Sequence, residues 1–191
     1  MAERPSPLSP AVNPILSAAS YDRLVVTGAP PAMAGKLLAG VGVERLFAAP
    51  VWNSDDARAV LAGLWLWHDA LDESHTISQS IATPNGSFWH AIMHRREGDF
   101  ANAKYWYARC RHHAALGRVA AEAREVLGSA ADSGPLHRLL GDAWDPDGFV
   151  DVVEAVHRKR DDPLYATAVR LQQLEWHSLF DHCARGAVGQ P

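Results

Sequence analysis

Helix-breaking residues recur along this chain at intervals that leave room for helices but supply no run of strands. The breaks fall at Pro50, Thr83–Gly86, Gly98–Asp99, Gly117 and Asp145–Gly148. Between them, apolar residues recur every three or four positions, the period of a helix with one buried face. Because the connections are short, consecutive helices must pack side by side. The sequence therefore predicts an all-α fold in which antiparallel helical hairpins form a single compact array or bundle.

The helix starting near residue 53 has the clearest beginning. Asn53 or Ser54 can cap it, and Asp55 and Asp56 favour the positive end of the helix dipole. Residues 24–27 form a short β-branched run, expected as an extended piece or a single strand. The other expected helices extend over residues 31–50, 72–81, 87–97, 100–113, from Gly117 to about 128, briefly between 135 and 145, and over 149–160 and 164–184.

With 191 residues, the chain has the length of one domain that can bury its own core. We expect a single helical domain over residues 21–185. Residues 1–20 contain four prolines and are expected to form a flexible or surface-draped arm, and residues 186–191 a disordered tail.

Composition argues against several classes of function. The formal net charge of −4 favours neither nucleic acid nor an anionic membrane as a partner. No apolar run is long enough to span a bilayer, and the first residues do not resemble a signal peptide. The two cysteines, Cys110 and Cys183, are too few for a disulfide framework. These features predict a cytoplasmic protein, and they leave its oligomeric state open.

Histidines, tryptophans and charged residues concentrate between Trp65 and Trp106. His90 and His94 are four residues apart, so both project from one face of a helix, with Glu97 about one turn further on. Folding back at residues 84–86 places His75 opposite His94 in an antiparallel pair. His68 is expected at the same end of the array.

This juxtaposition raises the hypothesis of a metal site. His68, His75 and His94, with Glu97 or Asp72 as a carboxylate, suit zinc or iron. An open fourth position would allow water activation. The alternative is structural: the histidines cap turns, bond to backbone carbonyls or lie in a polar helix interface. No HExxH motif is present to decide between the two.

Charged residues around the Gly98 turn allow two interpretations. Arg95, Arg96, Asp99 and Lys104 form either a structural ion-pair cluster or, with Tyr107 and His90, a site for an anionic ligand. Glu175 and Asp181 can add ligands if the array curls round. The basic runs 109–113 and 157–160 are expected to be solvated helix faces, and Asp161–Asp162 follows the second run. No nucleophile elbow or phosphate-binding loop is present.

Residues of two consecutive hairpins follow a common layout of small and aromatic positions, over about residues 57–115. The second unit resembles a tetratricopeptide repeat, and the first follows it less closely, at an offset of 29 residues instead of 34 and with Asp69 where the family has glycine. The resemblance implies a scaffold that binds a protein or peptide. The residues concerned are Ala91, His94, Gly98, Asp99, Phe100, Ala103, Tyr107 and Cys110, and before them Ala62, Trp65, Asp69, Leu71, Ser74, Ser78 and Ile81.

Two functional hypotheses follow. The first is a helical binding or interaction protein whose site on residues 65–106 takes a protein, a peptide or a small anionic ligand. The alternative is a metal-dependent enzyme using zinc or iron, hydrolytic in type, that acts on a small molecule. In a third interpretation, the whole cluster only holds helices together.

Overall fold

The computed structural model describes residues 6–128, 134–139 and 144–190, and it confirms the all-α prediction. Within these ranges no sheet forms, and an isolated β-bridge joins Leu8 and Phe47. The helices are α1 (Val12–Ser17), α2 (Ala32–Leu38), the 3-10 helix η1 (Val43–Leu46), α3 (Ser54–Trp67), α4 (Leu71–Ser78), α5 (Pro84–Glu97), α6 (Phe100–Tyr107), α7 (Ala114–Gly128), α8 (Gly134–His137), α9 (Pro146–Val156) and α10 (Pro163–Ala187).

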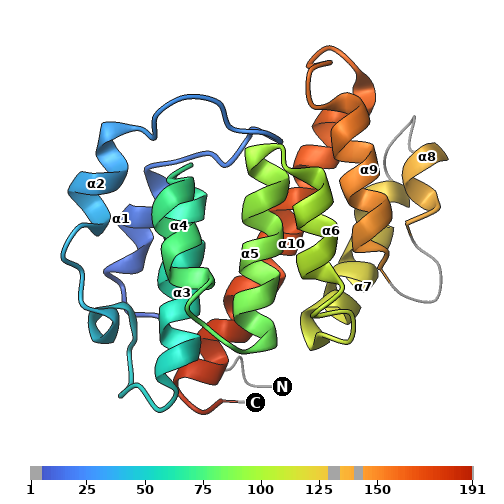
Figure 1. Cartoon of the computed structure of the whole chain (residues 1–191). Coiled ribbons are helices and arrows are strands. Elements are labelled where there is room, and N and C mark those ends of the chain that lie inside the picture. Colours follow the sequence, from blue (N-terminus) through green and yellow to red (C-terminus); the bar gives the residue numbers. More distant parts are fainter. Residues whose placement is uncertain (1–5, 129–133, 140–143, 191) are drawn as a thin grey trace.

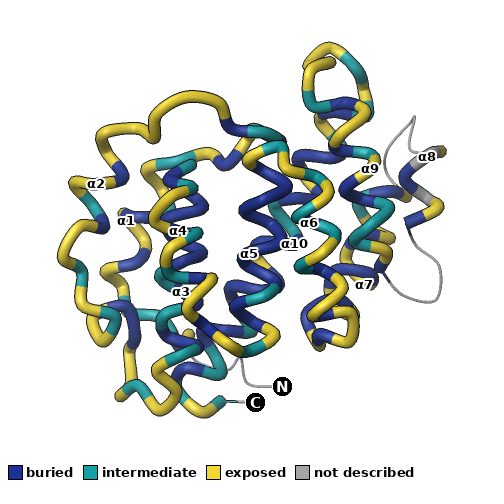
Figure 2. Tube along the Cα trace, in the orientation of Figure 1, coloured by how far each residue is buried: buried dark blue, intermediate teal, exposed yellow. Residues whose placement is uncertain are grey.

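Two helical hairpins, α3–α4 and α5–α6, stand next to each other, and the long α10 crosses behind them (Figure 1). Helix α4 packs against α5, while α10 packs against α3, α5, α7 and α9. As a result α5 lies in the middle of the array and is buried along most of its length (Figure 2). The helix that carries His90 and His94 is therefore surrounded by other helices.

Local chemistry explains where these helices begin and end. Asn53 caps α3 by accepting hydrogen bonds from the backbone N–H groups of Asp55 and Asp56, as predicted. Pro84 occupies the first turn of α5, where its missing N–H costs nothing. Gly98 ends α5 with a φ of +91°, a left-handed conformation that glycine adopts without strain. The helix ends at the predicted Gly98 turn, but it begins at Pro84 instead of the expected residue 87, so the predicted break at residues 84–86 is the first turn of α5.

The centre of the core depends on a close approach at Gly63 of α3. A Cβ atom there would lie 2.7 Å from the Trp89 ring, so glycine is needed for α3 to lie against α5. The Gly63 carbonyl also accepts a hydrogen bond of 2.9 Å from the indole N–H of Trp176 on α10. This contact ties three helices together behind the face that carries the histidines.

Several predicted boundaries were wrong. The helix expected over 31–50 stops at Leu38, because the chain turns at Gly40 with a φ of +75° and resumes only as η1. Helix α6 ends at Tyr107 instead of residue 113, and Gly117 lies inside α7 instead of separating two helices. Residues 24–27 form no strand; this irregular segment is held by hydrogen bonds from the Val26 N–H to the Arg96 carbonyl, 2.7 Å long, and from the Leu24 N–H to the Tyr165 hydroxyl, 3.4 Å long.

The two ends of the domain also differ from expectation. Part of the predicted N-terminal arm forms α1, whose Val12 and Ile15 are buried because they pack on α3. Helix α10 continues to Ala187, and the Ala187 carbonyl accepts hydrogen bonds from the backbone N–H groups of Trp52 and Asn53. Neither segment is excluded from the fold. No helix in the described part of the chain has the length and apolar character needed to cross a membrane.

Candidate functional site

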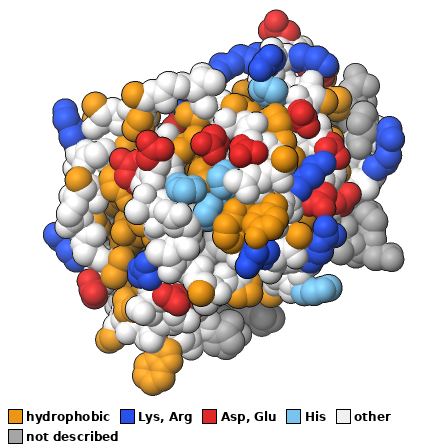
Figure 3. Space-filling model, in the orientation of Figure 1, with side chains coloured by type: hydrophobic (Ala, Val, Ile, Leu, Met, Phe, Trp, Pro, Cys, Tyr) orange, Lys and Arg blue, Asp and Glu red, His pale blue; other side chains and the backbone are white. Residues whose placement is uncertain are grey.

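Three histidines from two adjacent helices converge on one face of the molecule. His90 and His94 come from α5, and His75 comes from α4. One potential ligand nitrogen from each ring lies within 4.8 Å of the other two. Histidine side chains gather on the face that α4, α5 and α6 present in Figure 3, beside acidic and apolar side chains. The sequence placed His75 opposite His94 across the α4–α5 turn; in the structure the His75 ring lies beside both His90 and His94.

The three imidazole rings are close enough to share one ion. His90 and His94 stack with 4.7 Å between ring centroids, and His75 presents its edge to them at 4.6 Å and 5.4 Å. A tetrahedral zinc ion with nitrogen ligands at 2.0–2.1 Å holds those nitrogens about 3.4 Å apart. The His75 ring is half-buried, and no side-chain hydrogen bond to it is present in the described residues.

His90 is tightly packed, and one of its ring nitrogens has no hydrogen-bond partner in the described residues. Only 3% of the residue is exposed, and its ring stacks on Trp106 of α6 with 4.1 Å between centroids. Its Nδ1 atom is buried and has no hydrogen-bond partner in the described part of the chain. Because an unpaired buried polar atom costs free energy, this nitrogen is one that a metal ion or another ligand would satisfy.

His94 is oriented by two polar neighbours. The Glu97 carboxylate lies 2.9 Å from Nδ1, so Nδ1 carries the ring N–H and donates a hydrogen bond to the carboxylate. The lone pair is then on Nε2. The side-chain amide nitrogen of Asn102 lies 3.0 Å from Nε2 and 3.4 Å from Nδ1, and of these two atoms Nε2 is the one that can accept its hydrogen bond. Carboxylate–histidine pairs of this kind fix the tautomer and orientation of metal-binding imidazoles.

The surroundings of His90 and His94 favour the neutral form of both rings. Burial, and after it the neighbouring His94 and His75, lowers the pKa of His90 to about 4. Burial also lowers the pKa of His94, against the opposing effect of Glu97. A metal binds the unprotonated ring, which is the form that these lowered pKa values favour at neutral pH.

His68, predicted as a third metal ligand, lies elsewhere. It follows the last residue of α3, is buried, and its Nε2 is 2.8 Å from the Ile15 carbonyl of the N-terminal segment. The structure thus groups His90, in place of His68, with His75 and His94. Two carboxylates were considered as further ligands. Asp72 is exposed, and Glu97 bonds to Nδ1 of His94, whereas the lone pair of that ring is on Nε2.

Arg95 and Tyr107, predicted to bind a ligand, belong to a closed internal network. Arg95 donates hydrogen bonds of 2.6 Å to the Tyr107 hydroxyl and to the Glu175 carboxylate of α10, and Tyr107 donates a further one of 3.0 Å to Glu175. The side chains of Arg95 and Glu175 are completely buried. Glu175, which the sequence left as a possible extra ligand, instead neutralises Arg95.

Arg96 is also structural. It donates to the Leu66 carbonyl at 2.7 Å and to the Asp69 carboxylate at 2.5 Å, and its guanidinium lies 4.0 Å from the centroid of the Tyr21 ring. Asp69 has a φ of +61°, so the turn after α3 is held in a strained conformation by this ion pair. Arg96 therefore fixes the α3–α4 turn to the end of α5 and faces no ligand.

Two more predicted residues have surface partners. Lys104 forms an ion pair with Asp151 of α9, and Asp181 pairs with Arg118 and Arg185. The predicted site therefore separates into a histidine cluster, which contains His75, His90 and His94, and structural contacts behind it. The contact of Asn102 with His94 was not predicted, because Asn102 lies beyond the Gly98 turn. It could have been inferred from the position of Asn102 eight residues after His94, on the helix that runs back along α5.

A second polar cluster joins the starts of α3 and α5. Asn85 donates a hydrogen bond of 2.5 Å to Asp56 and accepts one of 2.6 Å from His113, whose Nδ1 accepts from the backbone N–H of Ala115. Burial raises the pKa of Asp56 and lowers that of His113 to about 4. Because these bonds use both His113 nitrogens and both Asn85 groups, the cluster holds helices in place.

Comparisons of the chain with protein-family models, curated proteins and solved structures gave no match. Function must therefore be argued from the geometry of this molecule.

Proposed function

We propose that this chain binds a divalent transition metal, zinc or iron, through His75, His90 and His94. The observation that carries the proposal is the convergence of three imidazole nitrogens within 4.8 Å, one of them on a buried ring with an unpartnered Nδ1. Imidazole is a ligand that both metals accept. Nearby Glu97 supplies the carboxylate that orients His94.

Three protein ligands leave a tetrahedral ion one open position, which is the arrangement of catalytic zinc sites. A zinc ion held by these three residues would lower the pKa of a bound water to roughly 7 and so would supply a nucleophile at neutral pH. His75 is only half-buried, so the open position can face solvent. We therefore propose a metal-dependent hydrolytic enzyme that acts on a small molecule.

The interaction-module hypothesis has less support. Its predicted contact residues included Arg95, Arg96 and Tyr107, and all three are buried with internal partners. What is left for a partner is the surface of Tyr105, Trp106 and Arg109, where the guanidinium lies 5.2–5.4 Å from the centroids of both rings. This surface adjoins His90, so we treat it as a neighbour of the metal site.

Metal binding is tested on protein purified without an affinity tag or chelator. Elemental analysis is expected to find one zinc or iron per chain, lost in His90→Ala and kept in His112→Ala, a matched control because His112 is exposed and outside the cluster. Circular dichroism checks that both variants fold. Equal metal content in the two variants, or none in the wild type even after incubation with zinc, would refute the proposal.

The open position is tested separately by replacing the ion with cobalt(II). Tetrahedral cobalt with a bound water is expected to change its visible spectrum as that water loses a proton at roughly pH 7. A spectrum that stays constant from pH 6 to 9 would mean that the position is closed, and it would refute the hydrolytic part of the proposal while leaving metal binding intact.

A further inference from the structure

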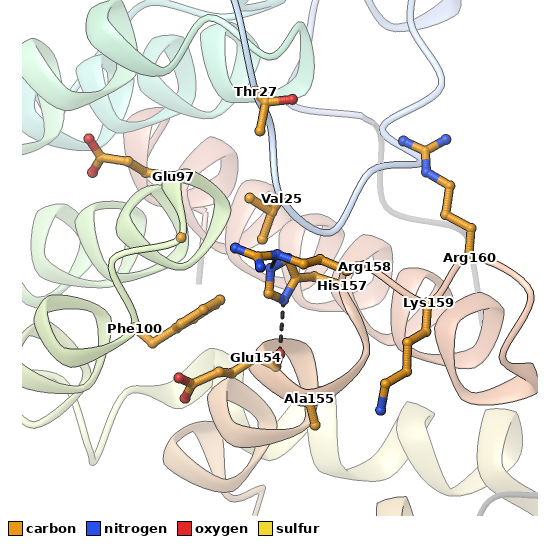
Figure 4. A pocket seen from close by; sticks show the side chains of 11 residues that line it. Val25, Thr27, Glu97, Phe100, Glu154, Ala155, His157, Arg158, Lys159 and Arg160 are labelled. Carbon is orange, nitrogen blue, oxygen red and sulfur yellow. Dashed lines mark hydrogen bonds between the residues drawn. The ribbon is translucent and has the colours of Figure 1, made fainter.

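A pocket lies at the far end of α5, away from the α4–α5 turn. It is a pocket of about 660 Å³ between residues 25–27, the α5–α6 turn and the end of α9 (Figure 4). The Val26–Arg96 backbone hydrogen bond holds one wall against α5. Gly98 and Phe100 form the second wall, and residues 154–160 form the third. Three separate parts of the chain therefore build this pocket.

The interior of the pocket combines a cation with apolar surface. In Figure 4 the side chains of His157 and Arg158 lie between Val25 and Phe100, whereas Lys159 and Arg160 extend outward from the rim. The rings of Phe100 and His157 are 5.5 Å apart, centroid to centroid. A ligand that enters here meets a positive group and an aromatic side chain together.

Hydrogen bonds fix the direction of the Arg158 guanidinium. His157 donates from Nδ1 to the Glu154 carbonyl at 2.9 Å, which leaves Nε2 as an acceptor. Arg158 donates to that atom through Nε, at 3.2 Å. Within the described residues both terminal nitrogens of Arg158 have no partner. They are the pair of donors that binds a carboxylate or phosphate in a bidentate manner.

The positive charge of the pocket is not compensated by the nearby acids. Arg158, Lys159 and Arg160 form no ion pair in the described part of the chain, whereas Lys104 and Arg111 pair with Asp151 and Asp147 of the same helix α9. The Glu154 carboxylate points away from Arg158 in Figure 4. The carboxylate of Asp162 accepts the N–H of Leu164 and caps α10. The expectation that Asp161–Asp162 neutralises this run is therefore not met by any ion pair.

We propose that this pocket binds a small molecule that carries a carboxylate or phosphate on an apolar body. The anionic group pairs with Arg158, and the apolar part lies against Phe100 and Val25. Glu97 lines the same pocket and also bonds to His94, so the pocket shares a wall with the histidine cluster. The inference is independent of the metal site, because none of the three histidines lines the pocket.

The test is a calorimetric titration of the full chain, treated with chelator so that metal cannot bind the probes. Phenyl phosphate and benzoate are titrated in parallel, with benzyl alcohol as the uncharged control. Saturable binding of either anion, without binding of benzyl alcohol, is expected, and the stronger anion identifies the ligand group. No saturable binding of either anion in the millimolar range would overturn the proposal.

Variants then locate the site. Arg158→Gln removes the charged donor and is expected to weaken anion binding roughly tenfold or more. Arg170→Gln is the matched control, because Arg170 is an exposed arginine of α10 outside the pocket. Both residues are exposed, so both variants are expected to keep the wild-type melting temperature. Equal affinity of Arg158→Gln and wild type for the anion would overturn the proposal.

Discussion

Asn102→Ala tests whether the Nε2 lone pair of His94 is the one that binds metal. In the structure the Asn102 amide donates a 3.0 Å hydrogen bond to that lone pair. A metal ion that binds His94 through Nε2 must first displace this donor. Removing the amide removes the competition, so the variant is expected to bind zinc more tightly than the wild type.

The magnitude follows from the one hydrogen bond at stake. A neutral hydrogen bond contributes about 0.5–1.5 kcal/mol net, because water replaces it when it breaks. Removing this competitor should therefore strengthen zinc binding by about 2- to 12-fold. The change is small enough that both proteins must be measured at one pH against the same chromophoric chelator.

The control is Asn13→Ala, at an exposed position on α1. It is expected to leave zinc affinity unchanged. If Asn102→Ala binds zinc as the wild type does, or more weakly, while its melting temperature is unchanged, the assignment of Nε2 as the ligating atom is wrong.

Three further outcomes are expected. Glu97→Gln weakens zinc binding by roughly 10- to 100-fold in a chelator competition, because His94 loses the carboxylate that orients it; unchanged affinity would exclude that role. Glu175→Ala, which leaves Arg95 charged and buried, lowers the free energy of unfolding in urea by about 3–5 kcal/mol, whereas a loss below about 1 kcal/mol would contradict the buried ion pair. Metal-free protein loses stability as the pH falls from 6.5 toward 4. The reason is that His90, with a pKa of about 4, stays unprotonated in the folded protein while the unfolded chain takes up the proton. In His90→Gln the loss of stability over this pH range is smaller, and a pH profile identical to that of the wild type would contradict the lowered pKa.

The sequence allowed the helical hairpins and part of the site to be predicted, because both depend on local signals. Asn53, Pro84 and Gly98 mark helix ends through their own backbone chemistry. Residues 84–86 belong to α5 instead of to the turn before it, yet counting along two antiparallel helices still brought His75 close to His94. The resemblance to tetratricopeptide repeats stays a prediction.

The misassigned residues depend on contacts between distant parts of the chain. His68 bonds to a carbonyl 53 residues away, in a proline-containing segment whose short helix α1 gave no clear periodic signal. Arg95 finds Glu175 across 80 residues. Neither spacing nor composition tells which acid an arginine will meet, so a paired arginine beside histidines looked like a ligand-binding group.

Anomalous diffraction from crystals of zinc-loaded protein, measured on both sides of the zinc absorption edge, tests the central claim most directly. If zinc binds as proposed, one strong peak is expected about 2.0–2.1 Å from a nitrogen of each of His75, His90 and His94. A fully occupied peak at any other place in the molecule, with no peak among these three rings, would contradict it.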